Sequence, residues 1–209
     1  MRLKKQLVGA SLVATAALLL ASSAFAQKTK TVIFGTTSVQ LSSEFTGGLK
    51  SLGLEANTVS PSTLAGGTVT FPIVAGAIDL DTAAGEIIHS GGLVLENEEK
   101  NESDETAVRL QSFTIDTTNP QKPILTGLVI LNNQLLGRFP LFNLALPSGI
   151  TLPLKAEGGF VLQLNGVGVT LTQTAATTLN SVYKTKALTA GFPVGTASVF
   201  AIVQSYREK

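Results

Sequence analysis

The chain has 209 residues, with 15 Lys and Arg against 14 Asp and Glu, and it contains no cysteine. This near-neutral balance offers no basic face, so a nucleic-acid partner is not expected, and the absence of thiols excludes disulfides and cysteine chemistry. The length suits one domain with a core of its own.

The first 26 residues have the pattern of a cleaved secretory signal peptide. Arg2, Lys4 and Lys5 form a positive start, an apolar run of about 14 residues follows, and residues 24–26 read Ala-Phe-Ala. The run is shorter than the roughly 20 residues that span a bilayer. We therefore predict export to the periplasm, the medium or the cell surface, with no membrane span in the mature chain. The mature chain, residues 27–209, carries 12 basic and 14 acidic residues, a charge near −2.

Apolar and polar residues alternate along most of the mature chain, which is typical of half-buried strands. A short helix is expected after Ser42, which can cap its start, and Gly53 can end it. Residues 58–67 are predicted to be a connection, because Pro61 is unsuited to a central strand. Pro72 suggests that its strand lies at an edge or carries a bulge. Strands are expected at 32–34, 69–73, 77–80, 86–89, 93–95, 108–115, 124–131, 135–146, 160–164, 167–171 and 197–203.

Three turns organise the second half of this pattern. Asn132-Asn133 and Asn165-Gly166 are each predicted to close a hairpin. Residues 96–105, with six acids against one lysine, are predicted to form a solvated hairpin loop. The proline-punctuated segment 139–154 is interpreted as an apolar connection on the surface of the fold.

These elements predict an all-β protein, an antiparallel β-sandwich with two short helices, as one domain over 27–209. A weak echo links residues 38–42 with 168–172, each followed by a short helical stretch. Either a duplicated unit or coincidence explains it. The echo suggests that the first and last strands meet.

The residues that could carry chemistry are few. His89 is the only histidine, and as strand neighbours His89 and Ser90 point to opposite faces, so a nucleophilic pair is not expected. One histidine without cysteine excludes ordinary zinc sites. Asp79 and Asp81 and the acidic loop could attract calcium, but neither matches the twelve-residue calcium loop. We therefore predict neither an enzyme nor a metal site.

The central stretch resembles the HtaA-like domains of secreted and surface-attached bacterial proteins over residues 36–131. The residues that carry the resemblance are Gly67-x-Val69-x-Phe71-Pro72-Ile73, Gly76-x-Ile78, Gly85-x-Ile87-x-His89-x-Gly91-Gly92-Leu93-x-Leu95 and Val108-x-Leu110-x-x-Phe113-x-Ile115.

The resemblance implies a fold and a ligand class. Members of the family bind haem, with a tyrosine ligating the iron and a histidine supporting it, and His89 matches the supporting position. The early strand that bears the tyrosine in the family reads Thr36-Thr37-Ser38-Val39-Gln40-Leu41 here, and no tyrosine precedes Tyr183.

Three hypotheses follow for the function. In the first, the protein is a secreted, non-enzymatic binding or cell-envelope interaction module with an unknown ligand and no cofactor. In the second, it binds haem through His89, with Tyr183 or Tyr206 brought close by the fold. The third, a hydrolase, would need a carboxylate that orients His89 toward a serine.

Overall fold

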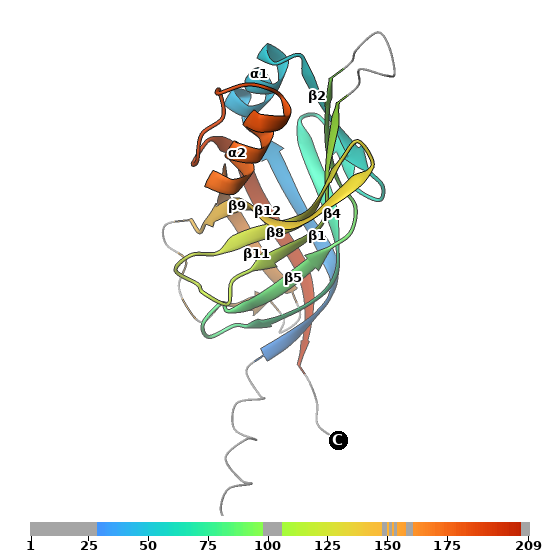
Figure 1. Cartoon of the computed structure of the whole chain (residues 1–209). Coiled ribbons are helices and arrows are strands. Elements are labelled where there is room, and N and C mark those ends of the chain that lie inside the picture. Colours follow the sequence, from blue (N-terminus) through green and yellow to red (C-terminus); the bar gives the residue numbers. More distant parts are fainter. Residues whose placement is uncertain are drawn as a thin grey trace, which may run out of the picture.

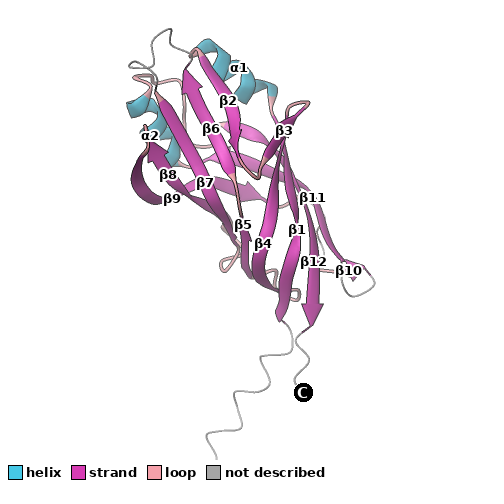
Figure 2. Ribbon diagram, turned by 90° about the vertical axis from the view of Figure 1, so that its right-hand side faces the viewer, coloured by secondary structure: helices cyan, strands magenta, loops and turns pink. Residues whose placement is uncertain are grey.

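The computed structural model describes residues 29–97, 106–147, 150, 152, 154–157 and 161–205. The predicted signal peptide at 1–26, most of the acidic loop and Tyr206 lie outside the described residues. Within them the chain is built almost entirely of antiparallel strands, with two short helices (Figures 1 and 2). The elements are β1(Thr29–Leu41), α1(Ser43–Ser51), β2(Leu54–Val59), β3(Thr63–Ala65), β4(Thr68–Asp79), β5(Gly85–His89), β6(Gly92–Asn97), β7(Ala107–Asp116), β8(Ile124–Leu131), β9(Gln134–Ala145), β10(Ala156–Glu157), β11(Val161–Leu171), α2(Gln173–Val182) and β12(Pro193–Ser205).

The strands close into a barrel. The order β7-β5-β4-β1-β12-β11-β9-β8 returns to its start because β8 also pairs with β7. Strands β2 and β6 extend the sheet beyond β7, while β3 and β10 add short pairings to β4 and β11. The first and last strands are direct neighbours, with Ser38 opposite Ser198, as predicted.

The all-β class and the two helices are confirmed, but the predicted β-sandwich is wrong. A sandwich needs two separate sheets that face each other. Here the β7–β8 pairing, from Val108 opposite Leu131 to Asp116 opposite Ile124, joins the two ends of one sheet. Closure removes the free edges of the eight barrel strands.

Register shifts in the long strands decide which side chains face the interior. In β1 the register against β12 shifts between Val32 and Phe34, so Val32 is buried before the shift and Thr37 and Val39 after it. Strand β11 shifts between Leu164 and Val167 in the same way. An extra residue at a bulge exchanges the two faces of a strand, which lets one long strand keep its apolar side chains inside the barrel.

The predicted hairpin at Asn165-Gly166 is therefore wrong. Strand β11 runs unbroken from Val161 to Leu171, and the Asn-Gly pair lies at its bulge. Gly166 has φ +79°, a backbone conformation suited equally to a bulge and to a tight turn. The hairpin at Asn132-Asn133 is confirmed, since Leu131 pairs with Gln134 across it.

Two other connections contain more regular structure than predicted. Residues 58–67 include the end of β2 and all of β3. The segment 139–154 begins with seven residues of β9, paired with β8 and β11, so this part belongs to the barrel wall. Pro72 lies beside the register shift of β4 against β5, between Ile73 and Ala75, in agreement with the expected edge or bulge.

Both helices lie at one end of the barrel, and the start of β1 and the end of β12 lie at the other (Figures 1 and 2). Ser42 caps α1 by accepting a hydrogen bond from the Phe45 amide at 3.0 Å, and Thr172 caps α2 in the same way through the Ala175 amide. Gly53 follows α1 with φ +67°, as predicted for a helix stop. Each helix thus follows a long barrel strand with a hydroxyl cap, which is the structural counterpart of the sequence echo.

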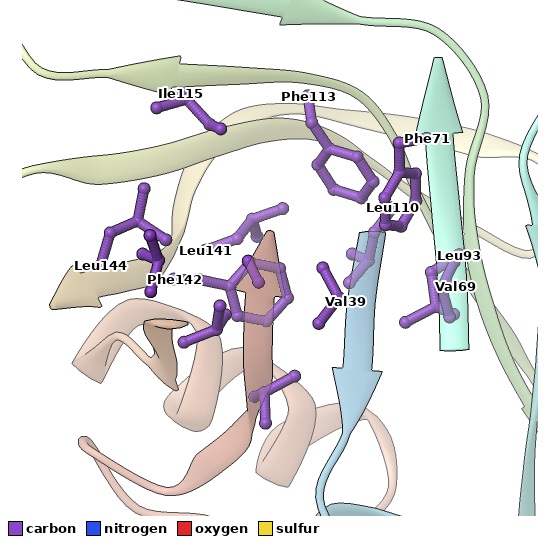
Figure 3. Close-up of a cluster of buried hydrophobic side chains, with 14 of the residues drawn as sticks. Val39, Val69, Phe71, Leu93, Leu110, Phe113, Ile115, Leu141, Phe142 and Leu144 are labelled. Atoms are coloured by element: carbon purple, nitrogen blue, oxygen red, sulfur yellow. The ribbon is translucent and has the colours of Figure 1, made fainter. Parts of the chain in front are cut away.

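The core fills the barrel with side chains from every barrel strand. Phe71 and Phe113 meet edge to face, with ring centroids 5.2 Å apart and planes at 86°. Their rings, with Val39 and Phe142, converge on the centre in Figure 3. Edge-to-face rings add about 0.5–1.5 kcal/mol beyond the burial of their area, so this contact fixes β4 against β7.

Candidate functional site

The barrel encloses an apolar cavity of about 100 Å³. Side chains from all eight barrel strands line it, together with residues of the connections 117–123 and 146–154. Its accessible wall consists of apolar atoms. Concave apolar sites of this kind are the usual place for a small ligand in a β-barrel.

His89 is part of this wall. It is the last residue of β5 and lies opposite Ile73 of β4, with 3% of its surface exposed. Its Nε2 atom is 2.7 Å from the hydroxyl oxygen of Thr37 on β1. Thr37 is equally buried at 3% exposure, so the two polar side chains meet inside an apolar interior.

The Nδ1 atom of His89 is buried without a hydrogen-bond partner. Backbone groups of Phe113 and Ile87 raise the pKa of the ring, but neither meets the geometry of a hydrogen bond to Nδ1. Whichever nitrogen carries the proton, one ring nitrogen therefore stays unsatisfied. An unmade buried hydrogen bond costs about 1–3 kcal/mol.

Burial keeps the imidazole neutral. Desolvation is the main cause that lowers the pKa of His89 from 6.5 to about 4, and the backbone groups of Phe113 and Ile87 oppose only part of that shift. Near pH 7 the ring is therefore uncharged and can donate one hydrogen bond and accept one.

Tyr183, the second predicted site residue, is placed elsewhere. It follows α2 as its C-cap, and its hydroxyl donates a 2.7 Å hydrogen bond to the carbonyl of Leu95 on β6. Burial is the main cause that raises its pKa, and the negative charge of Glu96 adds to this. Tyr183 does not line the cavity that contains His89. The structure therefore does not bring the two predicted residues to one site, and Tyr206, the third, lies outside the described residues.

Sequence reasoning did not single out Thr37, the partner of His89. A signal for it exists, because Thr37 is in phase with Val39 and Leu41, which both face the interior. A polar residue on the apolar face of a strand indicates a buried hydrogen bond.

The described residues offer little for hydrolysis or metal binding. The hydrogen-bond partner of His89 is a hydroxyl, so the carboxylate that orients the histidine of a catalytic triad is not in place there. The carboxylate of Asp79 accepts the backbone amides of Asp81 and Thr82 at 2.8 and 3.1 Å and closes a turn. No group of three or more potential metal ligands occurs among the described residues.

In the part of the chain that the structure describes, neither helix is long and apolar enough to cross a membrane. The leader pattern that predicts export lies outside the described residues.

Comparisons with known proteins define the fold. No family model and no curated protein sequence matches the chain. Among solved structures, the C-terminal domain of HtaA from Corynebacterium glutamicum is similar with a TM-score of 0.62 and 13% identity, covering 84% of this chain and 99% of that domain. The N-terminal domain of HtaA is similar with a TM-score of 0.61 and 10% identity, covering 83% of this chain and 99% of that domain.

The haem-binding protein HtaB from the same organism is also similar, with a TM-score of 0.56, 11% identity and coverage of 87% of this chain and 98% of that one. At these identities the likeness concerns the fold. The resemblance to HtaA-like domains is therefore confirmed in three dimensions: this chain has the HtaA-like fold.

Proposed function

We propose that this protein is an exported, non-enzymatic binding protein for a small molecule, and that haem is the ligand class with the best support. The observation that carries the haem proposal is the shared fold with a haem-binding protein, HtaB. This support is better than that for an interaction module with an unknown ligand, which stays the second candidate.

The position of His89 supports the same reading. The resemblance pairs a supporting histidine with a tyrosine on the early strand. In the structure His89 does contact that strand, through Thr37. This contact of His89 with the early strand supports the proposal, with a threonine hydroxyl as the partner of the histidine.

Neither side chain of the buried Thr37–His89 contact is free to ligate the iron. Tyrosine, histidine, cysteine and methionine hold haem iron in proteins, and an aliphatic hydroxyl is not among them. The Nε2 atom of His89 is occupied by Thr37 and the ring is buried. The cavity of about 100 Å³ is also well below the roughly 300–1,000 Å³ of pockets for larger ligands. Haem would therefore have to bind outside the barrel interior and without a tyrosine of β1.

A hemin titration of residues 27–209, followed by absorbance in the Soret region, tests the proposal. We expect a saturable one-to-one change for the unmodified protein. His89→Ala, Tyr183→Phe and Tyr206→Phe assign the three predicted residues, since loss of the change in one variant identifies that residue.

Tyr183→Phe also separates ligation from folding. Removing the hydroxyl leaves the Leu95 carbonyl without its donor, so a loss of stability with an unchanged hemin titration would show a structural role. A featureless titration of the unmodified protein would overturn the haem proposal and leave a binding protein for another ligand.

A further inference from the structure

The interior cavity is defined by the chemistry of its lining residues. Among the described residues that line it there is no Asp, Glu, Lys or Arg, and its accessible surface is formed by apolar atoms. The polar atoms of the Thr37–His89 pair are bonded to each other or buried behind that surface. A cavity of this kind excludes ions and stays dry, because water there would find no partners.

The shape of the cavity follows from the spread of its lining residues. Both Val69 and Ile78 of β4 line it, and they lie nine residues apart, about 30 Å along the strand. Leu162 and Val169 of β11 lie seven residues apart, about 23 Å along that strand. A volume of about 100 Å³ divided over such a length leaves a narrow space. A narrow space suits an alkyl chain better than a planar macrocycle.

The size is sufficient for a ligand. An apolar cavity of about 150 Å³ lined by Leu, Ile and Phe holds benzene, and the space here is of that order. Leu146 and Leu154 from the connection after β9, and Pro120 from the connection after β7, complete the apolar wall beyond the strands. An uncharged chain would thus meet apolar atoms along its whole length.

We propose that the barrel interior binds an uncharged alkyl chain, free or as the tail of a larger molecule. This inference extends the proposed binding function but stands apart from haem, because the two ligands are tested with different probes. Binding removes the apolar surface of the alkyl chain from water, so each methylene that enters the cavity tightens binding about fourfold.

The test is a titration of residues 27–209 with 1-butanol, 1-hexanol and 1-octanol, followed by the methyl resonances of Val and Leu in NMR spectra. We expect saturable shifts at Val199 and Leu164, which line the cavity, and affinity that rises with chain length until the space is filled. The exposed Val74, on the outer face of β4, reports on surface binding and should not shift.

Two variants alter the cavity in opposite directions. Ala197→Leu extends a side chain into it and should weaken 1-octanol binding by about tenfold. Leu164→Ala enlarges it and should tighten binding. Ala77→Leu, the same substitution at an exposed position of β4, is the matched control and should bind as the unmodified protein does.

Three results would overturn the proposal. The first is the absence of saturable shifts in the unmodified protein and in Leu164→Ala alike. The second is a set of shifts centred on Val74 instead of Val199, which would place the alcohols on the outer face. The third is tighter binding of benzene than of any alkanol, which would show a ring-shaped site. A hemin titration without change would leave the alkyl proposal standing.

Discussion

At the scale of single residues, the buried His89–Thr37 pair is the unusual feature of this protein. Two polar side chains are 97% buried in an apolar barrel and share one hydrogen bond of 2.7 Å, which leaves the second ring nitrogen without a partner. A valine–leucine pair in the same place would remove the unsatisfied atom. The pair therefore costs stability, as functional residues often do.

The titration of His89 should be visible in stability. The folded protein binds the proton with a pKa of about 4 and the unfolded chain with a pKa of 6.5, so between these values the unfolded state binds more protons. The free energy of unfolding should then have its full value above pH 6.5 and fall by about 3 kcal/mol as the pH drops to 4. Urea unfolding at a series of pH values measures this.

Because His89 is the only histidine, one variant isolates its effect. His89→Gln keeps a polar side chain but cannot titrate. Most of the change in unfolding free energy with pH between 6.5 and 5 should therefore be absent in this variant. An equal slope in both proteins would show that carboxylates cause the pH dependence and that His89 titrates alike in both states.

At the scale of the elements, bulges in the long strands exchange their inward and outward faces, as a turn does between two shorter strands. Leu162 and Leu164 face the cavity before the β11 bulge, and Val167 and Val169 face it afterwards. An alternation that changes phase at Asn-Gly fits both a hairpin and a bulge. What distinguishes them is whether β12 pairs with both halves of the strand, and it does.

Two glycine-to-alanine substitutions test this backbone description. Gly166 at the bulge has φ +79°, and an added Cβ would meet only ordinary contacts with Pro147, so Gly166→Ala should cost about 1–2 kcal/mol from backbone strain alone. Gly47 lies in α1 with open space around it, so Gly47→Ala should stabilise by about 0.5–1 kcal/mol. Urea unfolding measures both, and a neutral Gly166→Ala would contradict the assigned bulge.

At the scale of the whole molecule, closure depends on one pairing between distant parts of the chain and one between consecutive strands. Strand β1 pairs with β12 near the other end of the chain, and β8 pairs with β7, the strand before it, as well as with β9, so that a long sheet becomes a barrel with an interior. The cavity exists because the sheet closes. An open sandwich from the same strands would bury the same alternating residues without enclosing that space.

A disulfide can test the β1–β12 closure. Ser38 and Ser198 are direct partners, and their neighbours Thr37 and Val199 both face inward, so the two serines lie side by side on the outer face. Facing residues of antiparallel strands lie at about 4.5–5.5 Å, within disulfide range. The Ser38→Cys, Ser198→Cys double variant should oxidise within the monomer.

The oxidised double variant should gain about 5 kcal/mol over its reduced form, because the bond closes a very long loop of the unfolded chain. Mass spectrometry and urea unfolding with and without reductant measure the two effects. Since the natural chain has no cysteine, no other bond can form within the molecule. Oxidation only between molecules would contradict the pairing.

Local patterns were enough to identify most of the strands, both helices, the Asn132-Asn133 hairpin and the resemblance to HtaA-like domains. Alternation, caps and turn residues act between near neighbours, so the amino-acid order carries them directly. The same holds for His89, the single histidine, and for the absence of a tyrosine from residues 36–41.

Long-range pairing decided everything else. Whether strands close into a barrel depends on the pairing of β1 with β12, near opposite ends of the chain, and on β8 pairing with β7 as well as with β9, and no local pattern distinguishes this arrangement from a sandwich. Tertiary folding likewise joined Thr37 to His89 across 52 residues, kept Tyr183 at α2 and created the apolar cavity. Cavities and buried pairs are properties of packing between distant segments, so they arise only when the chain is folded.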